Sequence, residues 1–118
     1  MLYAHKIIGA VSSVAGEADK HLKRLKKLNT IECLWVYVLK MLSKGPSHAY
    51  VLRKRIQEEF GFRPGLVTAY KVLYDLQRLG LVTKRKQGMK RIYEITDKGR
   101  ADLRKAAGFY RKMAKKLK

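Results

Sequence analysis

Residues 66–96, LVTAYKVLYDLQRLGLVTKRKQGMKRIYEIT, decide the fold of this 118-residue chain. The first part of this stretch predicts a helix over 66–79, because its apolar residues recur every three or four positions. Gly80 follows directly, and glycine commonly ends a helix because it adopts a left-handed backbone conformation without strain. The face of this helix that we expect to be buried comprises Ala69, Val72, Leu73, Leu76 and Leu79.

The second part of the stretch predicts a β-hairpin. Two short strands are expected at 81–84 and 91–96, joined by a loop around Gln87 and Gly88. Between Thr83 and Arg91 the sequence carries five cations and no acid. A rigidly held loop that carries only positive charge suits the binding of phosphates better than it suits a purely structural role.

A helix is expected from about residue 30 to Ser43. Asn29 or Thr30 would cap its first turn, because the side chains of these residue types accept hydrogen bonds from free backbone N–H groups. Its apolar spacing places Trp35 in the core.

A further helix is expected over about 48–60, with Ser47 as its cap and Phe60 on its inner face. Its outer face carries Arg53 and Lys54. Together with the helix at 66–79, these segments predict three short helices that come before a basic hairpin.

Long amphipathic helices are expected at both ends of the chain, over 3–28 and over 97–118, the second capped by Thr96. In both segments the apolar residues alternate spacings of three and four, as in the seam of a coiled coil. One small domain is not expected to cover both seams, so we predict a homodimer. The predicted dimer contacts are Ile8, Val11, Ala15, Leu22, Leu25, Leu103, Tyr110, Met113 and Leu117.

The charge of the chain narrows the class of partner. There are 28 Lys+Arg residues against 9 Asp+Glu, a formal net charge of +19, and the sequence pI is about 10.3. Such a surplus attracts a polyanion, which is nucleic acid, an anionic membrane surface or an acidic partner. No stretch is apolar for the roughly 18 residues that a membrane span needs, so no membrane partner is expected.

The start of the chain and its cysteine usage indicate the compartment. The weakly apolar stretch 7–15 is too short and too broken for a signal peptide, and Cys33 alone excludes an internal disulfide. We therefore expect a cytoplasmic protein, associated with the nucleoid.

Three short helices followed by a basic hairpin are the arrangement of a winged helix-turn-helix. We predict one mostly α domain, 1–118, in which 30–96 form a winged helix-turn-helix with a two-stranded β wing between the dimerisation helices. The helix at 66–79 would enter a major groove of double-stranded DNA, and the wing, 84–91, would contact the phosphate backbone or the minor groove. The predicted DNA contacts are Arg53, Lys54, Val67, Thr68, Tyr70, Lys71, Tyr74, Lys84, Arg85, Lys86, Lys90 and Arg91.

Three segments resemble PadR-like winged-helix transcriptional regulators. The run YKVLYDLQRLGLV at 70–82 resembles their recognition-helix segment, GPSHAYVL at 45–52 is similar to their Gly-Pro-x-His-Gly-Tyr-x-Leu motif, and YEITDKGR at 93–100 resembles their strand-to-helix junction. Ala49 and Val67 depart from the family, which usually has glycine there. The chain is also similar to small crenarchaeal leucine-responsive-regulator-like proteins and to MarR-like proteins. The resemblance implies a homodimer whose terminal helices pair and whose recognition helices enter successive major grooves.

Other functions stay open beside a sequence-specific regulator. A weakly specific architectural protein that coats DNA is one, because +19 exceeds what the recognition of an operator requires. An RNA-binding winged helix is less favoured, because the aromatic residues do not form a stacking platform. The last alternative is a protein that only binds other proteins, through the apolar seams of the two terminal helices.

The residues that would carry catalysis or bind a metal are scattered. The nine acids form no pair, no nucleophile has a base beside it in a known motif, and His5, His21 and His48 lie far apart. We expect neither an enzyme nor a metal site nor a cofactor. A small-molecule effector stays open, without support from the sequence.

Overall fold

The computed structural model describes residues 19–118 and divides the chain into two compact units, Met1–Glu32 and Cys33–Lys118. In the first unit, residues 19–28 are helical, in agreement with the later part of the predicted helix over 3–28. Residues 3–18 of that prediction, with Ile8, Val11 and Ala15, lie outside the described residues.

The side chains of Asn29 and Thr30 end the helix that precedes them. Asn29 Nδ2 donates to the Leu25 carbonyl over 2.8 Å, and Thr30 Oγ1 donates to the Lys26 carbonyl over 2.6 Å. The prediction that one of them caps the next helix is wrong, because that α-helix begins only at Leu34 and its N-cap position is Cys33. The two side chains satisfy carbonyls that the last turn of the preceding helix leaves without an intrahelical partner.

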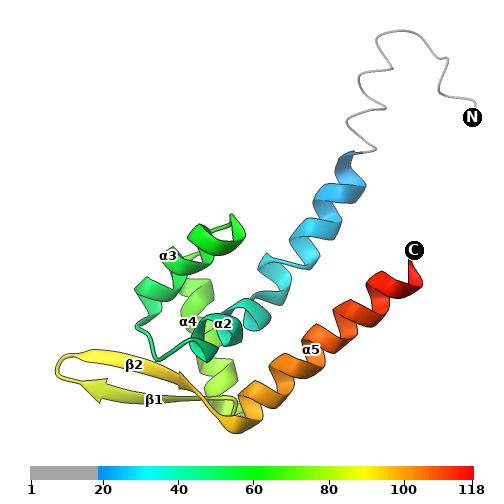
Figure 1. Ribbon diagram of the computed structural model, residues 1–118. Coiled ribbons are helices and arrows are strands. Elements are labelled where there is room, and N and C mark those ends of the chain that lie inside the picture. The colour runs from blue at the N-terminus through cyan, green and yellow to red at the C-terminus, as the bar shows by residue number, and fades with distance from the viewer. Residues whose placement is uncertain (1–18) are drawn as a thin grey trace, which may run out of the picture. The chain divides into compact units, whose positions relative to one another are not determined.

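The second unit contains four α-helices and one two-stranded antiparallel sheet (Figure 1). The predicted fold class, mostly α with a two-stranded β wing in a winged helix-turn-helix, is confirmed. After the short 3-10 helix η2(Ile31–Cys33), the elements are α2(Leu34–Ser43), α3(Ala49–Phe60), α4(Leu66–Arg78), β1(Val82–Gln87), β2(Lys90–Ile95) and α5(Asp97–Lys116).

Helix α2 is the centre of the core. Leu34, Leu39, Met41 and Leu42 are at most 1% exposed, since α3, α4, α5 and β2 all pack against this helix. Trp35, predicted to be in the core, is instead 36% exposed. The residues from the other elements that complete the core are Ala49, Leu52, Ile56, Leu73, Leu76, Leu81, Val82 and Tyr93.

Two further residues expected inside are exposed. Leu79 is 49% exposed because it follows the last helical residue of α4, where the chain turns into Gly80 at φ +78°. Phe60 is 38% exposed at the end of α3, although its ring packs edge-to-face on Tyr37 at 4.8 Å between centroids. Helical spacing alone does not reveal where the last turn leaves the core.

Ser47 forms an isolated β-bridge with Tyr93 of β2 and is not the cap of α3. Its backbone N–H donates to the Tyr93 carbonyl over 3.0 Å, and Tyr93 N–H donates back over 2.9 Å. The N-cap position falls on His48, whose side chain makes no capping hydrogen bond. The predicted cap is therefore wrong, because Ser47 pairs with β2 and attaches the hairpin to the start of α3.

The hairpin is longer and tighter than predicted. Its strands pair from Val82 opposite Ile95 to Gln87 opposite Lys90, which leaves a two-residue turn at Gly88 and Met89. Gly88 has φ +65°, a value that both common two-residue hairpin turns require at their first position. The prediction ended the strands where the alternation of apolar residues ended, but backbone pairing continues through the cationic residues.

Helix α5 begins at the predicted cap, since Thr96 Oγ1 accepts a hydrogen bond from Gly99 N–H over 3.0 Å. The same hydroxyl donates to the Gly80 carbonyl over 2.8 Å, which joins the end of α4 to the start of α5. Further along, α5 packs against α2, and Leu103 is half-buried against the core of its own chain.

Candidate nucleic-acid interface

Helix α4 divides into a buried and an exposed face along its whole length. Ala69, Leu73 and Leu76 are at most 3% exposed and anchor the helix in the core. The opposite face is open to solvent and contains every α4 residue predicted to contact DNA, namely Val67, Thr68, Tyr70, Lys71 and Tyr74.

The start of this helix is held by α3. Arg53 Nε donates to the carbonyl of the buried Pro64 over 2.8 Å, which fixes the turn before α4. Arg53, predicted to contact DNA, is half-buried and thus also has a structural role, whereas Lys54 is exposed. Lys71 lies 3.8 Å from Asp75, an exposed ion pair of the kind that contributes little to stability and leaves the ammonium accessible.

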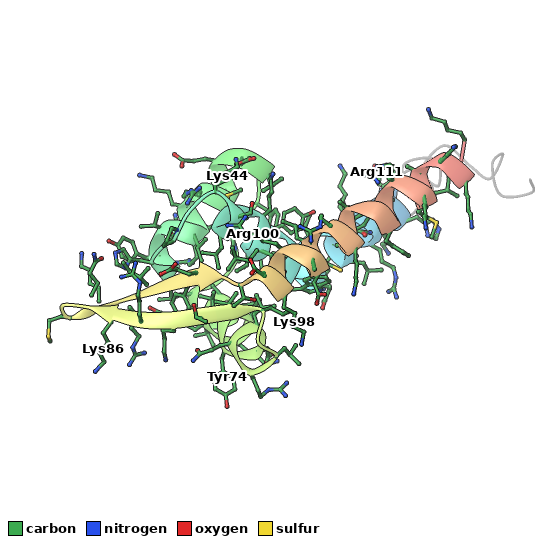
Figure 2. All side chains as sticks on the ribbon, turned by 60° about the horizontal axis from the view of Figure 1, so that its bottom comes forward. Lys44, Tyr74, Lys86, Lys98, Arg100 and Arg111 are labelled. Carbon is green, nitrogen blue, oxygen red and sulfur yellow. The ribbon has the colours of Figure 1, made fainter. Side chains whose placement is uncertain are left out.

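The hairpin presents a cluster of positive charge beside α4. All five cations predicted to bind phosphates, Lys84, Arg85, Lys86, Lys90 and Arg91, are exposed. Arg85 Nε donates to Glu94 Oε1 over 2.6 Å, so its charge is partly neutralised within the sheet. The Lys86 side chain and the Tyr74 side chain point away from the ribbon on the same side in Figure 2.

The register of the hairpin places like charges together. Lys86 lies directly opposite Arg91, on the same face of the sheet. Directly opposed cations destabilise an antiparallel pair, because their side chains lie close to each other. This arrangement is poor for folding and favourable for binding an anion.

A polar cleft of about 330 Å³ lies between the start of α3, the outer face of α4 and the end of the hairpin. His48 and Tyr50 stack there at 5.7 Å between ring centroids, and His48 Nδ1 lies 2.9 Å from the Arg91 carbonyl oxygen. The full lining is His48, Ala49, Tyr50, Tyr70, Met89, Lys90, Arg91 and Tyr93.

Sequence reasoning did not assign His48 and Tyr50 to the interface. Both stand in the GPSHAYVL segment, 40 or more residues before the strand they meet. At the back of the cleft, burial raises the pKa of the Tyr93 hydroxyl, Tyr70 raises it further, and Arg91 opposes both. Tyr93 is therefore neutral and remains a hydrogen-bond donor at ordinary pH.

A second cavity in this unit has a mainly apolar lining. Between α2 and α5 lies a cavity of about 470 Å³, whose lining includes Trp35, Phe109 and Tyr110. Burial raises the pKa of Tyr110, and Cys33 raises it further, partly through a side-chain hydrogen bond. Phe109 is nevertheless 59% exposed, Met113 one turn further along α5 is 43% exposed, and Leu117, directly after the last residue of α5, is 78% exposed.

Within residues 19–118, no group of three or more His, Cys, Asp or Glu side chains is placed to hold a metal ion. Among the same residues, no helix combines the length and the apolar composition that crossing a membrane requires.

Comparison with known proteins agrees with a winged-helix DNA-binding protein. Residues 38–105 match the model of the transcriptional regulator PadR-like family. The chain therefore belongs to that family and is a DNA-binding transcriptional regulator, not an enzyme. Comparison with curated proteins finds no match.

Solved structures share the fold. Bacillus subtilis PadR, solved in complex with operator DNA, is 27% identical with a TM-score of 0.59, covering 66% of this chain and 48% of that one. TA0346 from Thermoplasma acidophilum is 29% identical with a TM-score of 0.59, and the match covers 74% of this chain and 90% of that chain. A PadR-like transcription factor from Bacteroides fragilis is 17% identical with a TM-score of 0.68, covering 80% and 95%, and shows the fold alone.

Proposed function

We propose that this protein is a homodimeric, sequence-specific regulator that inserts α4 into the major groove of double-stranded DNA. The observation that carries the proposal is the division of α4, whose inner face is locked in the core while Val67, Tyr70 and Tyr74 are 82%, 44% and 65% exposed. A helix exposed in this way has the width that a major groove accepts. The operator complex of Bacillus subtilis PadR supports duplex DNA as the ligand.

The wing supplies affinity in this proposal. Its cations are suited to phosphates, which carry no direct sequence information, so the wing would contact the backbone or the minor groove while α4 reads bases. A regulator of this kind acts where the DNA lies, so we place the protein with the nucleoid in the cytoplasm.

The dimer is supported by exposed apolar residues in both units. Leu22 and Leu25 are 58% and 57% exposed in the first unit. In the second unit, every fourth residue from Phe109 through Met113 in α5 to Leu117 at its C-cap is apolar and exposed as well. A recurring apolar stripe of this kind is typical of a helix that pairs with another helix.

The experiment is a comparison of duplexes at one near-physiological salt concentration. A site selected from random DNA and a scrambled duplex are bound by the wild type, by Tyr70→Ala and by Lys71→Ala. We expect the wild type to prefer its site about a thousandfold or more. Each variant should narrow that preference by about 1–3 kcal/mol while its affinity for scrambled DNA stays nearly unchanged.

A DNA-coating function is the second candidate, and the net charge of +19 favours it. A coating protein and a sequence-specific regulator would share this fold, but they differ in the ratio of affinity for a selected site to affinity for scrambled DNA. A wild-type preference below about tenfold would establish coating instead of operator recognition. A parallel selection from a pool of random RNA tests the alternative that the protein binds RNA.

A further inference from the structure

The position of the polar cleft relates the two DNA-contacting elements to each other. Its lining includes Tyr70 from the outer face of α4, and Lys90 and Arg91 from the wing. In duplex DNA the major groove and the minor groove are separated by one sugar–phosphate strand. When α4 occupies the major groove, that strand runs past the side of α4 where the wing lies.

The chemistry of the cleft is that of an anion site. Its lining brings together two cations, three phenolic hydroxyl groups and one imidazole, and it includes no acid. Arg91 also faces Lys86 across the hairpin, and an anion between the two would relieve their repulsion. The volume of about 330 Å³ is about ten times the ~30 Å³ that a water molecule takes up in the liquid, enough for one phosphodiester group.

The cleft is also held in shape before any ligand arrives. The Ser47–Tyr93 backbone pair joins α3 to β2 with two hydrogen bonds of 3.0 and 2.9 Å. His48 Nδ1 lies within hydrogen-bonding distance of the Arg91 carbonyl, and Lys90 Nζ lies 5.9 Å from the centroid of the Tyr50 ring. Tyr50 is 53% exposed, so it is not a core residue.

We propose that this cleft binds one backbone phosphate of the DNA strand between the two grooves. The proposal rests on the function proposed above, since duplex DNA is the ligand. Lys90 and Arg91 supply charge, Tyr50 supplies a hydroxyl donor, and His48 is a positioning residue that holds the wing strand. The tip of the wing then lies on the far side of that strand, over the minor groove, with its remaining cations beside the phosphates that flank this groove.

The test is a scan of the selected duplex with single methylphosphonates, each of which replaces one charged phosphate by a neutral group. For the wild type we expect one phosphate in each half-site, beside the bases that α4 protects, at which the replacement weakens binding about tenfold. Lys90→Ala should weaken binding to the unmodified duplex to a similar degree. On the duplex that carries the methylphosphonate at that position, Lys90→Ala should weaken binding by less than about threefold, because the protein change and the DNA change remove the same contact.

Two further variants make the test specific to the cleft. Tyr50→Phe keeps the ring and its stack on His48 but removes the hydroxyl. For this variant, the methylphosphonate at the same phosphate should weaken binding less than it does for the wild type. Lys115→Ala removes another exposed charge, from α5, and should leave the whole scan as in the wild type. Circular dichroism and thermal unfolding establish that each variant is folded.

The outcomes separate this proposal from the proposed function. Suppose the wild type prefers its site, but Lys90→Ala and Tyr50→Phe show the same loss of affinity as the wild type at every methylphosphonate position. The cleft proposal is then overturned, while the proposed function as a sequence-specific regulator is unaffected. If the wild type shows no preference for any duplex, the proposed function fails. If inorganic phosphate shifts the amide resonances of Tyr50 and Lys90 in the free protein while the scan is flat, the cleft binds free anions and not DNA, which also overturns the proposal.

Discussion

Among the glycines that the structure describes, Gly99 is the one at which an added side chain has the least room. It is buried in the first turn of α5, and a Cβ atom added there would lie 2.2 Å from the backbone oxygen of Leu81 and 2.7 Å from Ile95 Cγ1. The obstacle at Leu81 is backbone, so it cannot move aside as a flexible side chain would. We expect Gly99→Ala to lower the free energy of unfolding by about 1–3 kcal/mol or more, measured by denaturant unfolding.

Gly108 is the matched control, because it lies in the same helix and an added Cβ would meet nothing within 4 Å. Gly108→Ala should raise the free energy of unfolding by about 0.5–1 kcal/mol, since alanine restricts the unfolded chain and favours the helix. Equal effects of the two substitutions would contradict the close approach of α5 to Leu81.

At the scale of elements, the wing should provide affinity without sequence preference. Lys84 and Lys86 are exposed and no ion pair in the described chain involves them, whereas Arg85 is paired with Glu94. We therefore expect Lys84→Ala with Lys86→Ala to weaken binding to selected and scrambled duplexes alike. The slope of log K against log salt should fall by roughly 0.9 for each phosphate that the hairpin no longer neutralises, measured by fluorescence anisotropy from low to high salt.

The control for the wing variant removes two charges from the polar side of α5, Arg111→Ala with Lys115→Ala. Its net charge equals that of the wing variant, so a general loss of charge would reduce both slopes equally. A wing variant with the wild-type slope would show that the hairpin does not contact the backbone.

At the scale of the whole molecule, the prediction concerns assembly. Phe109→Glu with Met113→Glu places two carboxylates on the exposed apolar face of α5, where burial against a second copy would be costly. We expect the wild type to sediment at about twice the 13.6 kDa chain mass at micromolar concentration, and this variant to shift toward the monomer. Operator affinity should fall with it, because half-site recognition depends on the dimer.

Arg111→Glu is the control for assembly, because Arg111 lies in the same helix two positions from both Phe109 and Met113, and residues two apart do not share a helix face. It should leave the sedimentation unchanged. A wild type that remains a monomer at every concentration would remove the two-groove docking arrangement.

Much of the fold follows from short-range pattern. The apolar spacing of 66–79, the glycine after it and the run of cations in the hairpin are local features, and each corresponds to an element of the structure. The exposed face of α4 was predictable for the same reason, since a helix that buries one face turns the other outward. The fold class and the exposed residues of α4 therefore required no knowledge of distant contacts.

What the tertiary structure decided lies where segments distant in sequence meet. Ser47 has the composition of a helix cap, yet its backbone pairs with Tyr93, 46 residues later, and this contact sets where α3 begins. Trp35 has helical core spacing, yet it is 36% exposed and lines a cavity between α2 and α5, although Leu39 one turn later is fully buried. The sequence by itself determined the elements and the sign of the charge. The cleft exists only because α3, α4 and β2 fold together, and no local pattern encodes that approach.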